Sequence, residues 1–279
     1  MVEITASAVK QLREKTGLPL MDCKQALKES DGDQSQAIEL LRKRGAEVMA
    51  KRSDRETAFG RFGIYCGVEN ERGAIVELKC ESAPVAANEE FIQLANDLAE
   101  QLATGPGAGS GEELLDQQSP SKSGMTLREQ KDDLFNRIRE VFNVGRMKRI
   151  NGGTGGYVHN AGTVSGVLVG INGGDDQLAK DVSMHIAAMR PTALKVEDLD
   201  QSMVAKEREI LREAALQEGK PEKIVDKMVE GRLRNFFAEQ VLLEQPFVKD
   251  DKNTVGKFAE LNKMEIKEYV HWELGETQA

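Results

Sequence analysis

Apolar residues recur at helical spacing in three runs within the first 50 positions. These runs lie at residues 8–12, 20–27 and 37–41. Thr5 can cap the first helix, Pro19 suits the first turn of the second, and Asp33 can cap the third. We expect the third helix to end before Gly45. Three short helices bury little apolar surface, so residues 1–50 are predicted to form a small binding module.

After a basic, polar linker at residues 51–57, the pattern changes to alternation. Residues 63–68 and 74–80 are predicted to be the two strands of a hairpin, with Glu77 and Lys79 on the face opposite the core. A helix is expected from about Asn88 onward. Its core-facing residues are predicted to be Phe91, Ala95, Leu98, Ala99 and Leu102.

The same order returns about ninety residues later, which indicates an internal duplication. Residues 156–159 and 163–171 are predicted to form the second hairpin. The helix after it carries Leu178, Ala179, Val182, Ile186 and Met189. We therefore predict an α+β fold with antiparallel sheets, each covered by a helix on one face, in two core subdomains at residues 58–140 and 141–279.

The remaining segments complete these two subdomains. Residues 126–142 predict a helix, residues 144–150 an edge strand, and residues 265–274 a terminal strand that rejoins the second sheet, with Trp272 as a core or edge anchor. Residues 203–243 predict a helical hairpin that turns at residues 219–221. The apolar face of its second helix is predicted to carry Ile224, Met228, Gly231 and Leu233.

Composition and charge narrow the class of partner. The chain has 279 residues, of which 39% are hydrophobic and 30% charged, a composition typical of globular proteins. The apolar runs are far shorter than the roughly 18 residues of a membrane span, so a cytoplasmic protein without a membrane partner is expected. The net charge of -9 argues against strong nucleic-acid binding and favours a protein partner. The basic stretches 42–55 and 146–149 are interpreted as a solvated helix end and an edge strand, with RNA contact as the alternative.

Motifs for covalent chemistry are missing. The chain has no Walker lysine loop, and its glycine clusters lack the strand and helix that would make a phosphate cradle. His159, His185 and His271 are scattered, and none lies in a zinc or nucleophile motif. The three cysteines are interpreted as buried free thiols. We predict no catalytic residues, no cofactor and no metal site, and a binding protein rather than an enzyme.

Several segments together resemble the elongation factor Ts family, from the first residues nearly to the last. They are ITASAVKQLREKTGLPLMDCKQAL, GGYVHNAGTVSGVLV, HIAAMRPTAL and GKPEKIVDKMVEGRLRNFFAEQVLLEQPFVKDDKNTV. The first departs from the family mainly at Pro19, where a small residue is usual. The resemblance implies a ubiquitin-associated-like three-helix module, a duplicated α+β core and a helical hairpin. It also implies a guanine-nucleotide exchange factor that binds the GTPase elongation factor Tu and disturbs its phosphate and magnesium site, so that GDP leaves and GTP can be loaded.

The resemblance also assigns contact residues. Arg13, Leu20 and Met21 match the surface that approaches the nucleotide domain of the GTPase. The alternative for Leu20 and Met21 is a place in the core, although Cys23 and its neighbours already supply a buried stripe. His159 matches a histidine of the duplicated core that lies near the other domains of the partner.

The chain departs from the family after Cys80. The family usually reads Glu-Thr-Asp-Phe-Val-Ala-Arg-Asn-Glu there, and its Thr-Asp-Phe-Val stretch is implicated in dislodging magnesium. This chain has Ser82, Ala83, Pro84 and Val85 in place of that stretch. Either the other contacts sustain exchange, or the partner has changed to fit, or exchange is poor. The last possibility defines the alternative function, an adaptor or RNA-associated translation protein.

Overall fold

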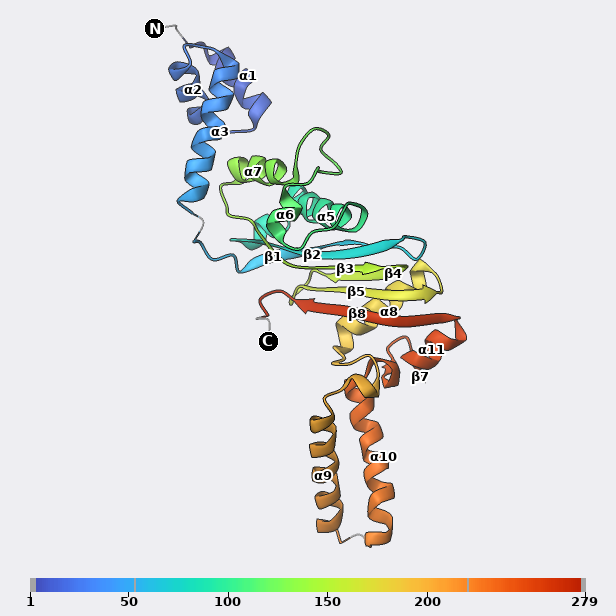
Figure 1. Cartoon of the computed structure of the whole chain (residues 1–279). Helices are drawn as coiled ribbons and strands as arrows, with labels where there is room; N and C mark the ends of the chain where they lie inside the picture. The colour runs from blue at the N-terminus through green and yellow to red at the C-terminus, as the bar shows by residue number, and fades with distance from the viewer. Residues whose placement is uncertain (1–3, 53, 220, 277–279) are drawn as a thin grey trace. The chain divides into compact units, whose positions relative to one another are not determined.

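Three helices begin the chain in the computed structural model, which describes residues 4–52, 54–219 and 221–276 (Figure 1). They are α1 (Ala6–Thr16), α2 (Leu20–Glu29) and α3 (Gln34–Ala50). The Thr5 hydroxyl accepts the Ala8 N–H, and the Asp33 carboxylate accepts two N–H groups in the first turn of α3. These caps were predicted, and they satisfy N–H groups that a helix start leaves unpaired. The buried side chains between the helices are Val9, Leu12, Leu18, Cys23, Ala26, Leu27, Ala37 and Leu41.

The predicted end of α3 is wrong, because the helix continues through Gly45 to Ala50. Gly45 is buried, and a Cβ atom added there would lie 1.8 Å from Asn136 Oδ1. Asn136 belongs to helix α7 (Leu127–Ile138). Gly45 is therefore a point of close helix–helix approach and not a helix stop.

The first sheet has three strands in the order β1-β2-β3. They are β1 (Phe59–Tyr65), β2 (Arg72–Cys80) and β3 (Asn143–Asn151), so the predicted edge strand is confirmed. After β2 come α4 (Ala83–Ala86), α5 (Glu89–Thr104) and α6 (Gly111–Leu115). Helix α5 begins where it was predicted, with Asn88 as its cap, and all five predicted core residues of that helix are buried. Helix α7 starts after its cap Thr126 as predicted but ends at Ile138, earlier than expected.

The alternation in β2 is misleading at one position. Glu77 was predicted to face solvent, but it is only 4% exposed. Arg146 on β3 covers it with a two-armed contact, in which Nη2 lies 2.8 Å from Oε1 and Nε lies 3.1 Å from Oε2. A carboxylate is buried only when such a partner compensates its lost hydration.

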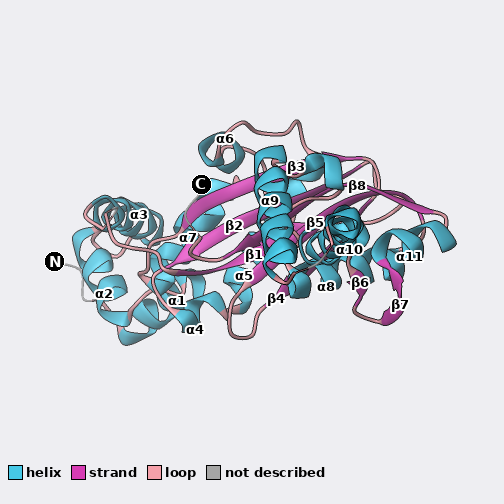
Figure 2. Ribbon diagram, turned by 90° about the horizontal axis from the view of Figure 1, so that it is seen from below, coloured by secondary structure: helices cyan, strands magenta, loops and turns pink. Residues whose placement is uncertain are grey.

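The second sheet repeats the arrangement with strands in the order β4-β5-β8. They are β4 (Thr154–His159), β5 (Ser165–Gly173) and β8 (Met264–Glu273), and both pairings are antiparallel. The predicted terminal strand is thus confirmed, and Trp272 lies on an edge strand opposite Gly166. Helix α8 (Asp176–Met189) lies against β4 and β5 (Figure 2). Ala179, Val182 and Ile186 are buried as predicted, whereas Met189 is exposed at the end of the helix.

The remaining elements follow α8. They are the 3-10 helix η1 (Val196–Asp198), α9 (Gln201–Gln217), α10 (Glu222–Gln240), the 3-10 helix η2 (Leu242–Glu244), β6 (Pro246–Phe247), β7 (Asp250–Thr254) and α11 (Val255–Leu261). Helices α9 and α10 lie side by side as the predicted hairpin (Figure 1). The face predicted for α10 is wrong in part, because Ile224 and Gly231 are exposed. Leu233 is buried as predicted, and it faces α9 together with Val225 and Val229, at spacings of four residues along one side of the helix.

The described residues divide into two compact units. One comprises the described residues up to Gly63, Val76–Met147 and those from Leu274 on, and the other comprises Ile64–Ile75 and Lys148–Glu273. The mixed α+β class with small antiparallel sheets agrees with the prediction. The subdomain boundaries inferred from the sequence stay a prediction. None of the described helices has the length and apolar character of a membrane span.

Candidate partner-binding surfaces

Two large apolar side chains are exposed at the start of α2. Leu20 is 47% exposed and Met21 is 68% exposed. The inner face of the same helix is occupied by Cys23, Ala26 and Leu27, which are fully buried. The alternative that Leu20 and Met21 belong to the core is therefore wrong. An exposed apolar pair on a small three-helix module is a feature of protein-contact surfaces.

Arg13 lies close to this pair along the chain. It is exposed in the last turn of α1, and its carbonyl accepts the N–H of Gly17, which has φ +69° and ends the helix. Glycine adopts this left-handed conformation without cost, so the chain can turn sharply into α2. A cation thus stands one helical turn before the corner that leads to the apolar pair. We call Arg13, Leu20 and Met21 the helical contact surface.

Residues 82–85, which the resemblance matched to the family's Thr-Asp-Phe-Val stretch, lie in the four-residue helix α4 and its cap. Ala83 and Pro84 are exposed, whereas Val85 is only 8% exposed and points inward. The Ser82 N–H and hydroxyl both donate to the carboxylate of Glu140, at 3.1 and 2.6 Å. The exposed tip is therefore small and rigid, and it has neither charge nor an aromatic ring. We call residues 82–85 the loop surface.

Glu81, just before the loop surface, is held by two donors. Its carboxylate accepts the Val141 N–H at 2.8 Å and pairs with Arg55 at 2.9 Å. Burial acts to raise the pKa of Glu81, but the Val141 N–H and Arg55 outweigh it, so the pKa lies below its ordinary value. The carboxylate stays ionised and anchors the base of the loop.

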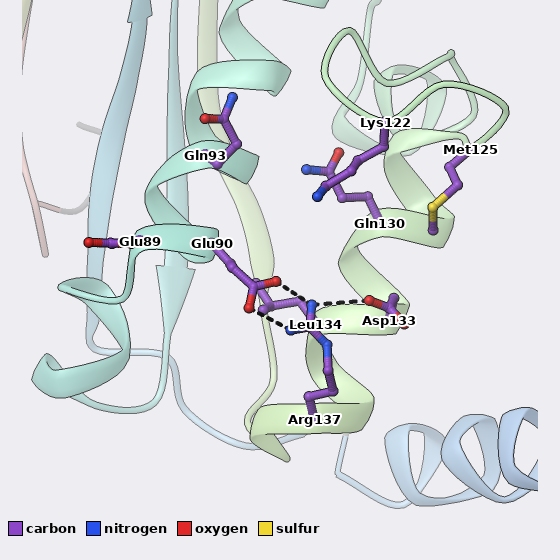
Figure 3. Close-up of a pocket in the computed structure, with 9 residues that line it drawn as sticks. All are labelled: Glu89, Glu90, Gln93, Lys122, Met125, Gln130, Asp133, Leu134 and Arg137. Atoms are coloured by element: carbon purple, nitrogen blue, oxygen red, sulfur yellow. Dashed lines mark hydrogen bonds and ion pairs between the residues drawn. The ribbon is translucent and has the colours of Figure 1, made fainter. Parts of the chain in front are cut away.

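A pocket of about 240 Å³ lies between α7 and α5, the helix that follows the loop surface along the chain (Figure 3). At its edge the Arg137 guanidinium bridges the carboxylates of Glu90 and Asp133. The hydrogen bond from Arg137 lowers the pKa of Glu90. Gln130 lines the same pocket and donates to the buried Asp97 at 2.7 Å. The pocket wall is thus tied together by polar contacts between the two helices.

His159 lies in the other compact unit, at the end of β4. It is exposed, and its Nδ1 is 3.2 Å from the hydroxyl of Tyr157. The two rings border a shallow depression of about 470 Å³ together with Arg190. His159 is therefore accessible to a partner. His159 belongs to the second unit, whereas the helical contact surface and residues 82–85 belong to the first.

The basic stretches are largely occupied by internal contacts. Arg44 pairs with Glu29, Arg52 donates to the carbonyl of Arg139, and Arg55 pairs with Glu81. Residues 146–149 lie on the edge strand β3, as interpreted from the sequence, and Arg146 on this strand has a side chain that is only 9% exposed against Glu77.

The cysteines agree only in part with the prediction. Cys23 and Cys80 are buried free thiols, whereas Cys66 is exposed. Burial raises the pKa of Cys80 to about 11, which keeps that thiol protonated and poorly nucleophilic at neutral pH.

Comparison with known proteins decides the family. The family model described as "Elongation factor TS" matches residues 81–276. The chain is 42% identical to Elongation factor Ts of Clostridium botulinum (strain Eklund 17B / Type B), over 98% of this chain and 93% of that protein. It is 40% identical to Elongation factor Ts of Aquifex aeolicus (strain VF5), over 98% of both proteins.

The chain belongs to the elongation factor Ts family. It is accordingly a translation elongation factor, as the resemblance of its sequence motifs indicated. A third relative, Elongation factor Ts of Hydrogenovibrio crunogenus (strain DSM 25203 / XCL-2), is 39% identical over 98% of this chain and 92% of its own length. In the described part of the chain, His, Cys, Asp and Glu side chains form no group of three suited to a metal ion.

Sequence reasoning did not single out the residues that hold these surfaces. Glu140 holds Ser82, and Arg139 donates to Asp22 beside Met21 at 2.8 Å. Both contacts join positions more than fifty residues apart, with separations of 58 and 117. A charged residue in a polar stretch gives no signal of such a partner, so only the folded chain identifies these two residues.

Proposed function

We propose that this elongation factor Ts family member binds the GTPase elongation factor Tu and promotes release of its GDP. It does so by disturbing the phosphate and magnesium site of the GTPase, after which GTP is loaded. The factor makes and breaks no covalent bond. The observation that carries the proposal is the exposure of Leu20 and Met21 on the three-helix module at the start of the chain, where Arg13 is exposed as well.

The energy required is large for one contact. If the factor lowers the affinity of the GTPase for GDP a thousandfold, it must bind the nucleotide-free GTPase roughly 4 kcal/mol more tightly than the GDP-bound form. A single exposed apolar pair contributes less than that, so several surfaces must act on the same partner. We assign Arg13, Leu20 and Met21 to the nucleotide domain of the GTPase and His159 to its other domains.

The loop surface has a reduced role in this scheme. Magnesium tolerates little distortion of its octahedral shell, so a small displacement of its ligands in the GTPase is enough to expel it. Pro84 presents a rigid apolar knob that reaches less far than a phenyl ring. Exchange therefore depends mainly on the helical contact surface and the core.

The test is release of fluorescent GDP from the GTPase of the same organism. The factor at micromolar concentration should accelerate release, and absence of any acceleration contradicts the proposal. Leu20→Ala with Met21→Ala should lower kcat/KM for release at least tenfold, by removing central apolar contacts. The matched control is Val248→Ala with Leu261→Ala, which truncates two other exposed apolar residues in the second unit and should leave the rate unchanged.

A second pair of substitutions tests the loop surface. Ala83→Asp with Pro84→Phe restores the family's charge and aromatic ring at exposed positions. The rate of GDP release should change if the loop meets the magnesium site of the GTPase. If the rate is unchanged, the loop surface takes no part in exchange, and the other surfaces alone account for it.

A further inference from the structure

The segment that leaves α7 touches both candidate contact surfaces of the first unit. We call residues 137–141 the strap. It contacts α2 beside Leu20 and Met21 through Arg139, and it contacts the loop surface through Glu140. Adjacent residues thus reach two surfaces that are about sixty residues apart in the chain.

The backbone of the strap is fixed at Arg139. This residue has φ +67° and ends α7 with its N–H donated to the Phe135 carbonyl at 2.6 Å. Its own carbonyl accepts a hydrogen bond from Arg52, which follows α3. A left-handed conformation is uncommon for a residue with a long side chain and is sustained only by surrounding contacts. The direction of the Arg139 side chain toward Asp22 is therefore set by the helix end.

The loop end of the strap is held by three hydrogen bonds. Glu140 accepts two from Ser82, and the Val141 N–H donates to Glu81. Helix α4 has only four residues, fewer than an isolated helix needs to persist in water. The exposed tip formed by Ala83 and Pro84 depends on these tertiary bonds for its position.

The first residue of the strap adds a third connection. Arg137 pairs with Glu90 at the start of α5, which follows the loop surface (Figure 3). On its other side, the aliphatic part of Arg137 packs against Gly17 at the corner before α2, where an added Cβ would lie 2.7 Å from Cδ. The strap thus contacts the segments at the base of both surfaces, through Arg137 at Gly17 and Glu90 and through Val141 at Glu81.

We propose that Arg139 and Glu140 are positioning residues, which hold the helical contact surface and the loop surface in one fixed relation for simultaneous contact with the GTPase. This inference rests on the proposed function. Two surfaces already oriented for one partner lose less conformational freedom on binding than two that move independently. The strap therefore raises the rate of exchange without itself touching the nucleotide or its magnesium ion.

The first test is Arg139→Gly, assayed by GDP release from the cognate GTPase. Glycine adopts φ +67° without strain, so the substitution removes the bond to Asp22 and keeps the helix end. We expect kcat/KM for release to fall roughly threefold to tenfold, with the melting temperature retained. The matched control is Lys263→Gly, which also replaces a long cationic residue of positive φ (+52°) by glycine and should leave the rate unchanged.

A double-mutant comparison separates positioning from a general structural role. In a background of Leu20→Ala with Met21→Ala, Arg139→Gly should have almost no further effect, because the side chains that it orients are gone. An equal fall in both backgrounds overturns the inference. At the other end, Glu140→Ala should slow release, and Glu140→Gln should restore part of the rate because its amide oxygen still accepts from Ser82.

The wild-type rate distinguishes the two levels of failure. If wild-type protein gives no acceleration of GDP release, the proposed function falls and this inference falls with it. If the wild type accelerates release and both Arg139→Gly and Glu140→Ala match it, the inference alone is overturned.

Discussion

At the scale of single residues, a buried imidazole couples stability to pH. His185 on α8 is fully buried, its Nε2 lies 2.9 Å from Gln245 Oε1, and its Nδ1 accepts the Val248 N–H at 3.3 Å. The lone pair of Nδ1 that accepts this hydrogen bond is the one that a proton would need, so the imidazole is neutral in this arrangement. Burial lowers the pKa of His185 below 6.5, and the bond to Gln245 offsets this only in part.

This arrangement predicts a loss of stability on acidification. Between the lowered folded pKa and the ordinary value near 6.5, the unfolded chain binds a proton that the folded chain does not. The free energy of unfolding should therefore fall as pH decreases below about 6.5, by about 1.4 kcal/mol for each unit of pKa depression. Urea unfolding at pH 7 and pH 5 measures it. His185→Gln should lose this part of the pH dependence, and identical slopes in both proteins contradict the assignment.

Single residues also show what the sequence can and cannot predict about the site. The exposure of Leu20 and Met21 was open at the sequence level, but the buried stripe through Cys23 favoured it, and that argument was correct. The contacts of Glu140 and Arg139 were not foreseeable, because each depends on a partner brought close only by folding. The inward direction of Val85 was missed for the same reason.

At the scale of elements, local patterns predicted where helices and strands begin better than what they touch. The caps predicted at Thr5 and Asp33 were correct, and so were the helix starts predicted near Asn88 and Thr126, since a cap is a contact within a few residues. The burial of Glu77 depends on Arg146, which lies 69 residues away. Periodicity describes one element at a time, and it therefore misses a solvent face that another strand covers.

Gly45 offers a test of the contact between α3 and α7. Alanine is the better helix former by about 1 kcal/mol, but its Cβ would overlap Asn136 Oδ1. Overpacking of this kind costs about 1–3 kcal/mol, so Gly45→Ala should lower the free energy of unfolding. With Asn136→Ala in place the overlap is gone, and the same substitution should become stabilising. Thermal or urea unfolding of the four proteins measures both signs, and a stabilising Gly45→Ala in the wild-type background contradicts the close approach.

At the scale of the whole molecule, the proposed exchange activity draws its binding energy from several contact surfaces together. The contact surfaces are small, and the exposed tip of the loop surface carries neither a charge nor an aromatic ring. Exchange then requires that several contacts favour the nucleotide-free GTPase over the GDP-bound form. Thermodynamic linkage makes this preference reciprocal. GDP must lower the affinity of the GTPase for the factor by the same ratio by which the factor lowers its affinity for GDP.

The most direct measurement is the dissociation constant of the factor for its cognate GTPase, determined by calorimetry without nucleotide and again at saturating GDP. We predict tight association without nucleotide and an affinity about a thousandfold weaker with GDP. This ratio should equal the ratio by which the factor lowers the affinity of the GTPase for GDP. Equal dissociation constants in the two conditions, or no association with the nucleotide-free GTPase, would contradict the account.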